Sequence, residues 1–149
     1  MNSSRILIIV AVSSTLSLAA CMSPNTQSTM AQQSLYDRLG GKPAITAVVD
    51  DFISNVAADP KINGRFASTN IAHLKQLLVE QICAGAAGPC VYSGRDMEAA
   101  HRGMNIRDEE FNALVGDLVK SLDKFKVPER EKGELLALLG PAKPQIVGH

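Results

Sequence analysis

The segment RDMEAAHRGM, residues 95–104, carries the side chains on which the interpretation of this chain depends. If the segment is helical, Met97 and His101 lie four residues apart on one face, so that a polarisable apolar side chain stacks against an imidazole. A neutral imidazole is a common axial ligand of haem iron. Taken alone, however, a histidine on a partly apolar helix is more often a structural residue whose hydrogen bonds are satisfied. The rest of the sequence has to decide between these two interpretations.

Apolar residues recur at helical spacing on both sides of this segment. They step by three and four residues along 45–56, 71–82, 111–125 and 135–139, which predicts amphipathic helices. Glycine and proline fall between these stripes, and Gly140-Pro141 is expected to end the last helix. No stretch alternates polar and apolar residues over the length of a strand. The pattern predicts an all-α domain, but periodicity alone does not distinguish a four-helix bundle from a helical fold built around a cofactor.

The first twenty residues have the features of a secretory signal. Arg5 precedes an apolar run over residues 6–18, and one positive charge before a short apolar stretch is typical of an export signal. The run is too short and too rich in serine for a permanent membrane-spanning helix. It ends in LAAC, residues 18–21, which resembles the bacterial lipobox, where the peptide is cut before the cysteine and lipid is attached to it. The alternative is an ordinary small-residue cleavage site with a coincidental cysteine.

These features predict three parts: a signal peptide over 1–20, a lipidated Cys21 with a flexible polar tether over 21–33, and one domain over 34–149. Acyl chains on Cys21 would hold the protein on a membrane without a spanning helix. We therefore expect a lipid-anchored protein of the cell envelope that faces the periplasm. An aspartate directly after the lipidated cysteine would resemble an inner-membrane retention signal. This chain has Met22 at that position, so the outer membrane is favoured.

The charge balance argues against one class of partner, and the cysteine content predicts a disulfide. Lys plus Arg equals Asp plus Glu, 15 of each, and no basic patch is interleaved with aromatic residues, so nucleic acid is not an expected partner. With Cys21 carrying lipid, Cys83 and Cys90 remain as an even pair in an oxidising compartment. A disulfide is the favoured interpretation, and the alternatives are two buried thiols or half of a metal site. No CxxCH motif for covalent haem attachment is present.

Several of these features together resemble the group I truncated haemoglobins, from Ser34 to about Pro144. The segment SLYDRLGG, residues 34–41, is similar to the family's short first helix and double-glycine turn. The resemblance continues through Asp51-Phe52, Arg65-Phe66, the triplet YSG at 92–94, Met97, His101, Ile106 and Phe111, which keep the family's relative spacing. It implies an all-α, two-over-two helical sandwich around haem b (iron protoporphyrin IX).

The resemblance also implies roles for individual residues. His101 is the proximal ligand of the iron, and Phe66 packs on the face of the haem. Tyr92, Met97, Ile106 and Phe111 line the pocket, and Phe52 lies on the distal side. Lys75 is a candidate partner for a haem propionate. His73 is expected at the surface or near a propionate.

The distal side departs from the family pattern. The position after Phe52 usually carries a tyrosine whose hydroxyl donates a hydrogen bond to the ligand, but this chain has Ile53. The distal helix often offers Gln or His, whereas the matching face here shows Leu74, Leu77 and Leu78. A hydrogen bond to a charged partner stabilises by about 1.5–3 kcal/mol, so oxygen should dissociate roughly ten- to a hundredfold faster without one. Gln81 would supply a donor only if its side chain turned inward.

Three functions are consistent with these expectations. The first is reversible binding of a diatomic gas (oxygen, nitric oxide or carbon monoxide) through His-ligated iron, which is favoured over a dedicated enzyme. The second is a nitric oxide dioxygenase or peroxidase on the same haem. Any electrons would come from a separate reductase, since the chain has no flavin or nicotinamide motif. The third is a cofactor-free structural lipoprotein of the envelope, which would be colourless.

Overall fold

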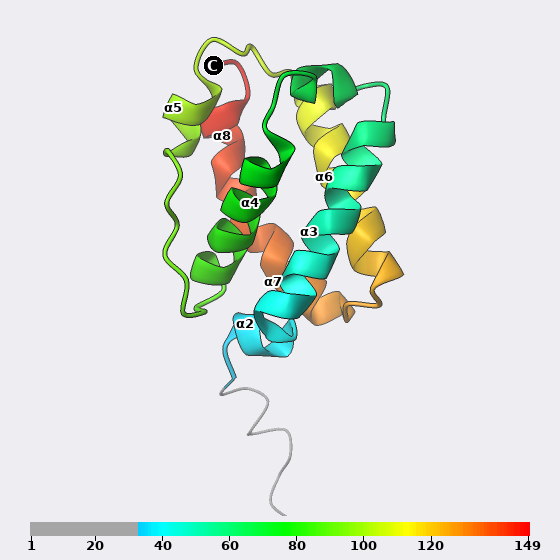
Figure 1. Ribbon diagram of the computed structural model, residues 1–149, viewed down its shortest axis with the longest axis vertical. Coiled ribbons are helices and arrows are strands. Elements are labelled where there is room, and N and C mark those ends of the chain that lie inside the picture. The colour runs from blue at the N-terminus through cyan, green and yellow to red at the C-terminus, as the bar shows by residue number, and fades with distance from the viewer. Residues whose placement is uncertain (1–32) are drawn as a thin grey trace, which may run out of the picture.

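The computed structural model describes residues 33–149, and this part of the chain is helical, as the sequence predicts (Figure 1). Its elements, in order, are α2 (Leu35–Arg38), α3 (Gly41–Ala58), the 3-10 helix η1 (Asn63–Phe66), α4 (Ile71–Gly85), α5 (Met97–His101), α6 (Asp108–Lys124), α7 (Glu129–Leu139), the 3-10 helix η2 (Gly140–Ala142) and α8 (Lys143–Ile146). Within these residues the one β-type pairing is an isolated parallel bridge between Ile106 and Val147. None of the described helices is long and apolar enough to cross a membrane.

The helix ends follow from local chemistry. The Ser34 hydroxyl accepts from the Asp37 backbone N–H at the start of α2, and the Asn70 side chain accepts from the His73 N–H at the start of α4. Gly40 adopts a φ of 93° between α2 and α3, and a Cβ there would lie 2.9 Å from the Ala44 Cβ. The double-glycine turn therefore depends on glycine at position 40 for both its backbone angle and its space.

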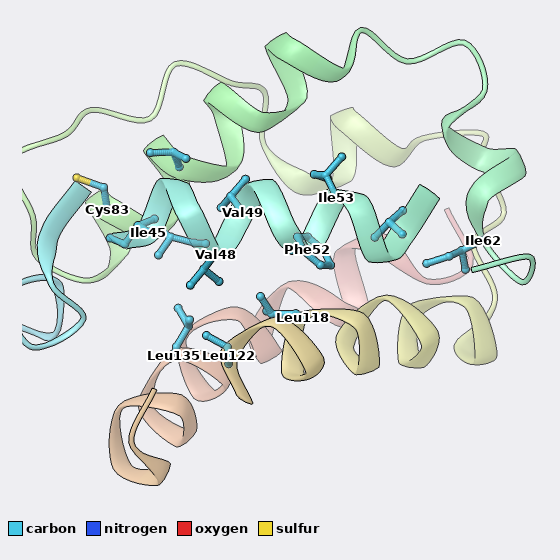
Figure 2. Packing of buried hydrophobic residues seen from close by; sticks show 13 residues of the cluster. Ile45, Val48, Val49, Phe52, Ile53, Ile62, Cys83, Leu118, Leu122 and Leu135 are labelled. Atoms are coloured by element: carbon cyan, nitrogen blue, oxygen red, sulfur yellow. The ribbon is translucent and has the colours of Figure 1, made fainter. Parts of the chain in front are cut away.

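The core is built around α3, which packs against α4 on one side and α6 on another (Figure 2). The apolar stripe predicted for this helix is buried in full, at Ile45, Val48, Val49, Phe52, Ile53 and Val56. Val49 is 0 % exposed and belongs to the same core cluster as Leu122 of α6 and Leu135 of α7. Burial of this stripe accounts for the stability of a helix that has no side-chain cap at its N-terminus.

A polar network that the apolar pattern did not predict lies inside the α3–α6 interface. The Ser121 hydroxyl donates to Asp51 Oδ2 at 2.9 Å, and Asn55 Nδ2 donates to the Ser121 hydroxyl at 2.9 Å. Asp117 is fully buried, and its Oδ1 accepts from Lys120 at 2.8 Å. On α6, Asp117 and Ser121 are buried together with the apolar residues Leu118 and Leu122. The network adds directional contacts to an interface that hydrophobic burial alone would hold less specifically.

The structure differs from the sequence predictions in two details near helix ends. Gly140-Pro141 ends α7 at Leu139 as predicted, but α7 is not the last helix: Pro141 lies in the first turn of η2, where its missing N–H breaks no hydrogen bond, and α8 follows directly. Phe125, expected in the apolar stripe of α6, lies just beyond that helix and is 43 % exposed. The chain turns away there, and Lys126 adopts a left-handed φ of 55°.

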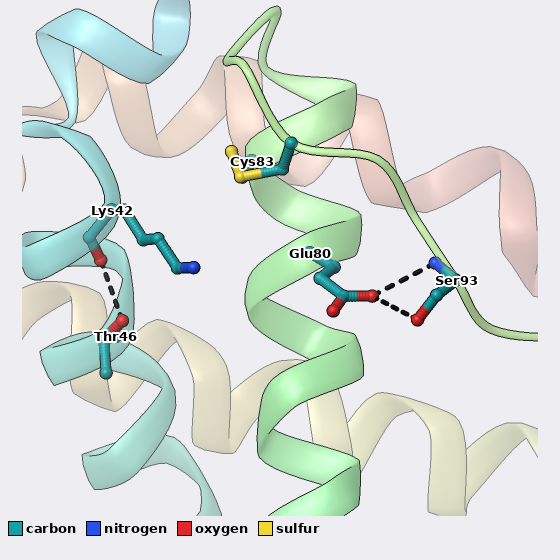
Figure 3. The surroundings of a disulfide bond; sticks show 6 residues. Lys42, Thr46, Glu80, Cys83 and Ser93 are labelled. Carbon is teal, nitrogen blue, oxygen red and sulfur yellow. Dashed lines mark hydrogen bonds between the residues drawn. A yellow bond between two sulfur atoms is a disulfide. The ribbon is translucent and has the colours of Figure 1, made fainter.

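Cys83 and Cys90 form a disulfide, with their Cα atoms 5.7 Å apart (Figure 3). The bond joins the C-terminal part of α4 to the segment that leads to α5. Gly88 lies inside this loop, and its N–H donates to the Cys83 carbonyl at 2.8 Å. A Cβ at position 88 would lie 2.5 Å from Tyr36 Cδ2, so the close approach of α2 requires glycine.

The segment after the disulfide is held to α4 by Glu80. Its Oε2 accepts from the Ser93 hydroxyl at 2.6 Å and from the Ser93 backbone N–H at 3.1 Å (Figure 3). The hydrogen bond from the Ser93 hydroxyl is the main cause that lowers the pKa of Glu80 below its ordinary value. Together with the disulfide, this contact fixes how the chain passes from α4 to α5.

Removing the disulfide should lower the free energy of unfolding by about 2–3 kcal/mol, because a closed loop of about eight residues restricts the unfolded chain. Urea unfolding of wild type and of the double variant Cys83→Ala, Cys90→Ala measures this difference. Wild type in reductant is the control and should lose most of the same stability. Free thiols at Cys83 and Cys90 in freshly purified protein would contradict the prediction.

Candidate functional site

The candidate iron ligand His101 is the last residue of α5, which forms where the sequence places it. The Asp96 side chain caps this helix by accepting from the Ala99 N–H at 2.8 Å. His101 Nδ1 lies 2.8 Å from the Met97 carbonyl oxygen. Since a carbonyl only accepts, Nδ1 carries the proton and donates, which leaves Nε2 of a neutral imidazole with its lone pair free. A histidine held in this way is oriented and in the tautomer needed to ligate a metal.

The residues predicted to line the pocket, on the proximal and the distal side, come from most elements of the domain. Phe52 and Ile53 on α3 are buried, each 6 % exposed. The others are half-buried, namely Phe66 in η1, Leu74 and Leu78 on α4, Tyr92 before α5, Met97 on α5, and Ile106 and Phe111 around the start of α6. Phe66, Leu74 and Leu78 pack against the core cluster from its edge. A histidine with one ring nitrogen free and a set of large, incompletely covered apolar side chains are the residue types that hold a flat apolar group containing a metal.

Gln81, which the sequence left open as a distal hydrogen-bond donor, contacts α5 in this structure. Its Nε2 lies 3.8 Å from the sulfur of Met97, so the amide is directed toward α5. His73 lies exposed in the first turn of α4, in agreement with a surface position. That Ile53, Leu74 and Leu78 form an apolar distal side stays a prediction.

Two of the predicted pocket residues have polar groups that are already engaged. The Lys75 ammonium pairs with Asp50 on α3 at 2.9 Å, so its charge has a partner on the α3 side of α4. The Tyr92 hydroxyl donates to the Arg95 carbonyl oxygen at 2.9 Å, within its own segment. Burial raises the pKa of Tyr92 above its ordinary value, which keeps this donor protonated. The Tyr92 hydroxyl is therefore already used within its own segment, and the ring is the part of the side chain that remains for apolar contacts.

Arg65 and Glu110, which directly precede the predicted aromatic residues Phe66 and Phe111 in sequence, form an ion pair. Arg65 Nε and Nη2 donate to the two carboxylate oxygens of Glu110, each at 2.9 Å. Glu110 is 6 % exposed and also accepts from the Arg107 backbone N–H. The Arg65 guanidinium, followed by these Arg107 contacts, lowers the pKa of Glu110 from 4.5 to about 2. The only sequence signal was the position of each charged residue beside an aromatic one.

The low pKa of Glu110 predicts a specific loss of stability in acid. A carboxylate whose pKa is lowered by folding stabilises the fold above its unfolded pKa, and this contribution disappears as pH falls from about 4.5 toward about 2. The stability difference between wild type and Glu110→Gln should be constant above about pH 5.5 and shrink below it. Urea unfolding of both proteins from pH 7 to pH 3 checks this. A difference that stays constant to pH 3 would count against the assignment.

Comparisons with known protein families and with known relatives both match this chain to globins. The family model of bacterial-like globins matches residues 34–147. The chain is 36 % identical over 113 residues to a group 1 truncated haemoglobin of Mycolicibacterium paratuberculosis, which covers 76 % of this chain and 83 % of that relative. It is 28 % identical over 117 residues to a group 1 truncated haemoglobin of Tetrahymena thermophila, covering 78 % of this chain and 97 % of the relative.

Solved structures of such proteins have a similar fold. The Fe(III) form of truncated haemoglobin from Tetrahymena pyriformis is similar with a TM-score of 0.75 and 27 % identity, over 78 % of this chain and 100 % of that one. The 2/2 haemoglobin of a Synechococcus species, solved in the cyanomet state with covalently attached haem, has a TM-score of 0.74 and 28 % identity over the same shares. The expected two-over-two helical architecture is therefore confirmed.

Proposed function

The chain belongs to the bacterial-like globins as a group 1 truncated haemoglobin, and from this we propose that it binds a diatomic gas reversibly at haem b held by His101. Oxygen, nitric oxide and carbon monoxide are the candidate ligands. Relatives named as haemoglobins imply the haem cofactor. The assignment of His101 and of the individual pocket residues is our proposal.

The observation that carries the proposal is the hydrogen bond from His101 Nδ1 to the Met97 carbonyl oxygen, at 2.8 Å. It leaves Nε2 free to ligate iron and restrains rotation of the ring. Met97 belongs to the half-buried apolar residues that would flank the haem, together with Phe66 and Phe111. Haem, when bound, supplies the iron at which the gas binds. The protein supplies the axial nitrogen and an apolar surround that excludes water.

The experiment that tests the proposal is haem uptake. Purified protein, or apoprotein titrated with haemin, should show a Soret absorption band that saturates at one haem per chain. Reduction and addition of carbon monoxide should then shift this band. A protein that remains colourless after titration would overturn the proposal and favour the third alternative, a cofactor-free structural lipoprotein.

The alternative function, a nitric oxide dioxygenase or peroxidase, has weaker support. A dioxygenase needs a long-lived oxygen complex, and the predicted distal residues Ile53, Leu74 and Leu78 offer no hydrogen bond to prolong it. Turnover would also need electrons from a separate reductase. We therefore favour gas binding.

We also propose that the protein is held at the cell envelope by lipid on Cys21. The signal peptide over 1–20 and the tether over 21–33 lie outside the described residues, apart from Gln33, and the support for this proposal is the sequence pattern LAAC alone. The outer membrane remains the favoured location, on the same basis.

Cys21→Ser should release the protein from membranes into the soluble periplasmic fraction, because the acylated thiol is lost. Membrane fractionation with immunoblotting, and intact mass measurement of the mature chain, test this. Cys90→Ser is the control that removes a cysteine without affecting the lipobox, and it should stay in the membrane fraction. Wild-type protein that is soluble and unmodified would contradict the lipid anchor.

A further inference from the structure

Arg65 joins parts of the chain that are far apart in sequence. Its Nε and Nη2 bind the two carboxylate oxygens of Glu110, and its Nη1 donates to the Met104 carbonyl oxygen at 2.9 Å. One planar guanidinium therefore bridges η1, the loop that follows α5 and the first turn of α6. We call this group of contacts the Arg65–Glu110 clasp.

Each attachment point of the clasp is close in sequence to a proposed haem-contact residue. Phe66 follows Arg65, Phe111 follows Glu110, and Met104 comes three residues after His101. In Figure 1 the loop from α5 to α6 crosses the same end of the molecule as the chain between α3 and α4. The clasp thus connects the corner that carries Phe66 to the loop that leaves the proposed iron ligand.

The contacts of the loop between α5 and α6 explain why loss of the clasp should affect this loop more than the stability of the whole fold. On its other side the loop is held by the C-terminal segment, where the Gly148 N–H donates to the Ile106 carbonyl oxygen at 3.0 Å. Without Arg65, Glu110 would still accept from Arg107, through the backbone N–H at 2.9 Å and Nε at 3.2 Å. The buried carboxylate would not be left unpaired, so the cost to the whole fold should be limited. The connection between η1 and the Met104 carbonyl would be lost.

We propose that the Arg65–Glu110 clasp holds the two sides of the haem pocket together and sets how long haem stays bound. Arg65 acts as a positioning residue, because its contacts are to protein and its effect passes through Phe66 and the loop after His101. The geometry requires arginine in particular, since a lysine ammonium cannot bind two carboxylate oxygens and a carbonyl with the same fixed planar fork. The inference rests on the proposed haem function.

The test is the rate at which ferric protein transfers haem to an excess of apomyoglobin. Arg65→Met should transfer haem about tenfold faster or more than wild type, since a factor of ten corresponds to about 1.4 kcal/mol, close to one charge-assisted hydrogen bond. Arg65→Lys should fall between the two. Arg107→Met is the matched control, because it removes the same charge and another Glu110 partner without touching η1. It should stay within about twofold of wild type.

Hydrogen exchange in the apoprotein separates a local effect from general destabilisation and does not need haem. In Arg65→Met the amides of Ala67 and Met104, which donate within the clasped segments, should exchange faster, while amides in the middle of α3 keep their protection. Arg65→Lys gives the same comparison if Arg65→Met does not fold.

The outcomes are distinguishable. A wild type that takes up no haem overturns the proposed function and the role of the clasp with it. A haem-loaded wild type whose transfer rate is unchanged by Arg65→Met overturns the clasp alone. Equal acceleration by Arg65→Met and Arg107→Met also overturns it, because the effect would then come from weaker Glu110 pairing in general.

Discussion

His101→Ala is expected to weaken haem binding by more than about a hundredfold, since loss of even an indirect partner of a metal ligand costs ten- to a hundredfold in affinity. The side chain supplies Nε2 as the axial ligand, and its Nδ1 is fixed on the Met97 carbonyl oxygen. Haem that remains should have a different ferrous spectrum, because another group such as Met104, 37 % exposed, would have to replace the imidazole. Haemin titration followed by absorption measures both effects.

The other two histidines of the chain are matched controls for this experiment. His73 is exposed on α4, and His149 Nε2 lies 3.0 Å from the Pro144 carbonyl oxygen at the C-terminus. Replacing either by Ala should leave the affinity and spectrum unchanged. Free imidazole should restore a wild-type-like spectrum to His101→Gly by filling the space that the side chain leaves. An unchanged ferrous spectrum in His101→Ala would show that the proximal assignment is wrong.

Ile53→Tyr is expected to slow oxygen dissociation by roughly ten- to a hundredfold, because the hydroxyl would add a hydrogen bond to a ligand that gains negative charge. Carbon monoxide, which is nearly nonpolar when bound, should be affected much less. The high ratio of carbon monoxide to oxygen affinity expected for wild type should therefore fall. Stopped-flow dissociation rates for both gases measure this change.

Ile53→Phe is the control that separates the hydroxyl from its bulk. Ile53 is 6 % exposed, so either aromatic ring must displace neighbours, at a cost of about 1–3 kcal/mol in stability. Phe should share this cost without slowing oxygen dissociation as Tyr does. If wild type already releases oxygen as slowly as the tyrosine variant, a donor such as Gln81 must leave Met97 and turn inward. The apolar interpretation of the distal side would then be wrong.

The sequence by itself determined the helical class, the main helices and the segment that carries the proposed iron ligand. Apolar residues at steps of three and four identify which face of a helix is buried, and this information is local. The stripe of α3 is buried in full for that reason, and α5 forms where Asp96 can cap it. The family resemblance rested on residue spacing, which is also carried by the sequence alone.

Only the tertiary structure decided how the polar groups pair. The Gln81 amide turns to Met97, Lys75 pairs with Asp50, and Arg65 reaches Glu110 across 45 residues. None of these pairings follows from periodicity, because a hydrogen bond depends on distances and angles that exist only after the helices have packed. Hydrophobic burial is non-directional and so can be predicted from a pattern, whereas the partner of a charged or amide group is selected by the packed fold.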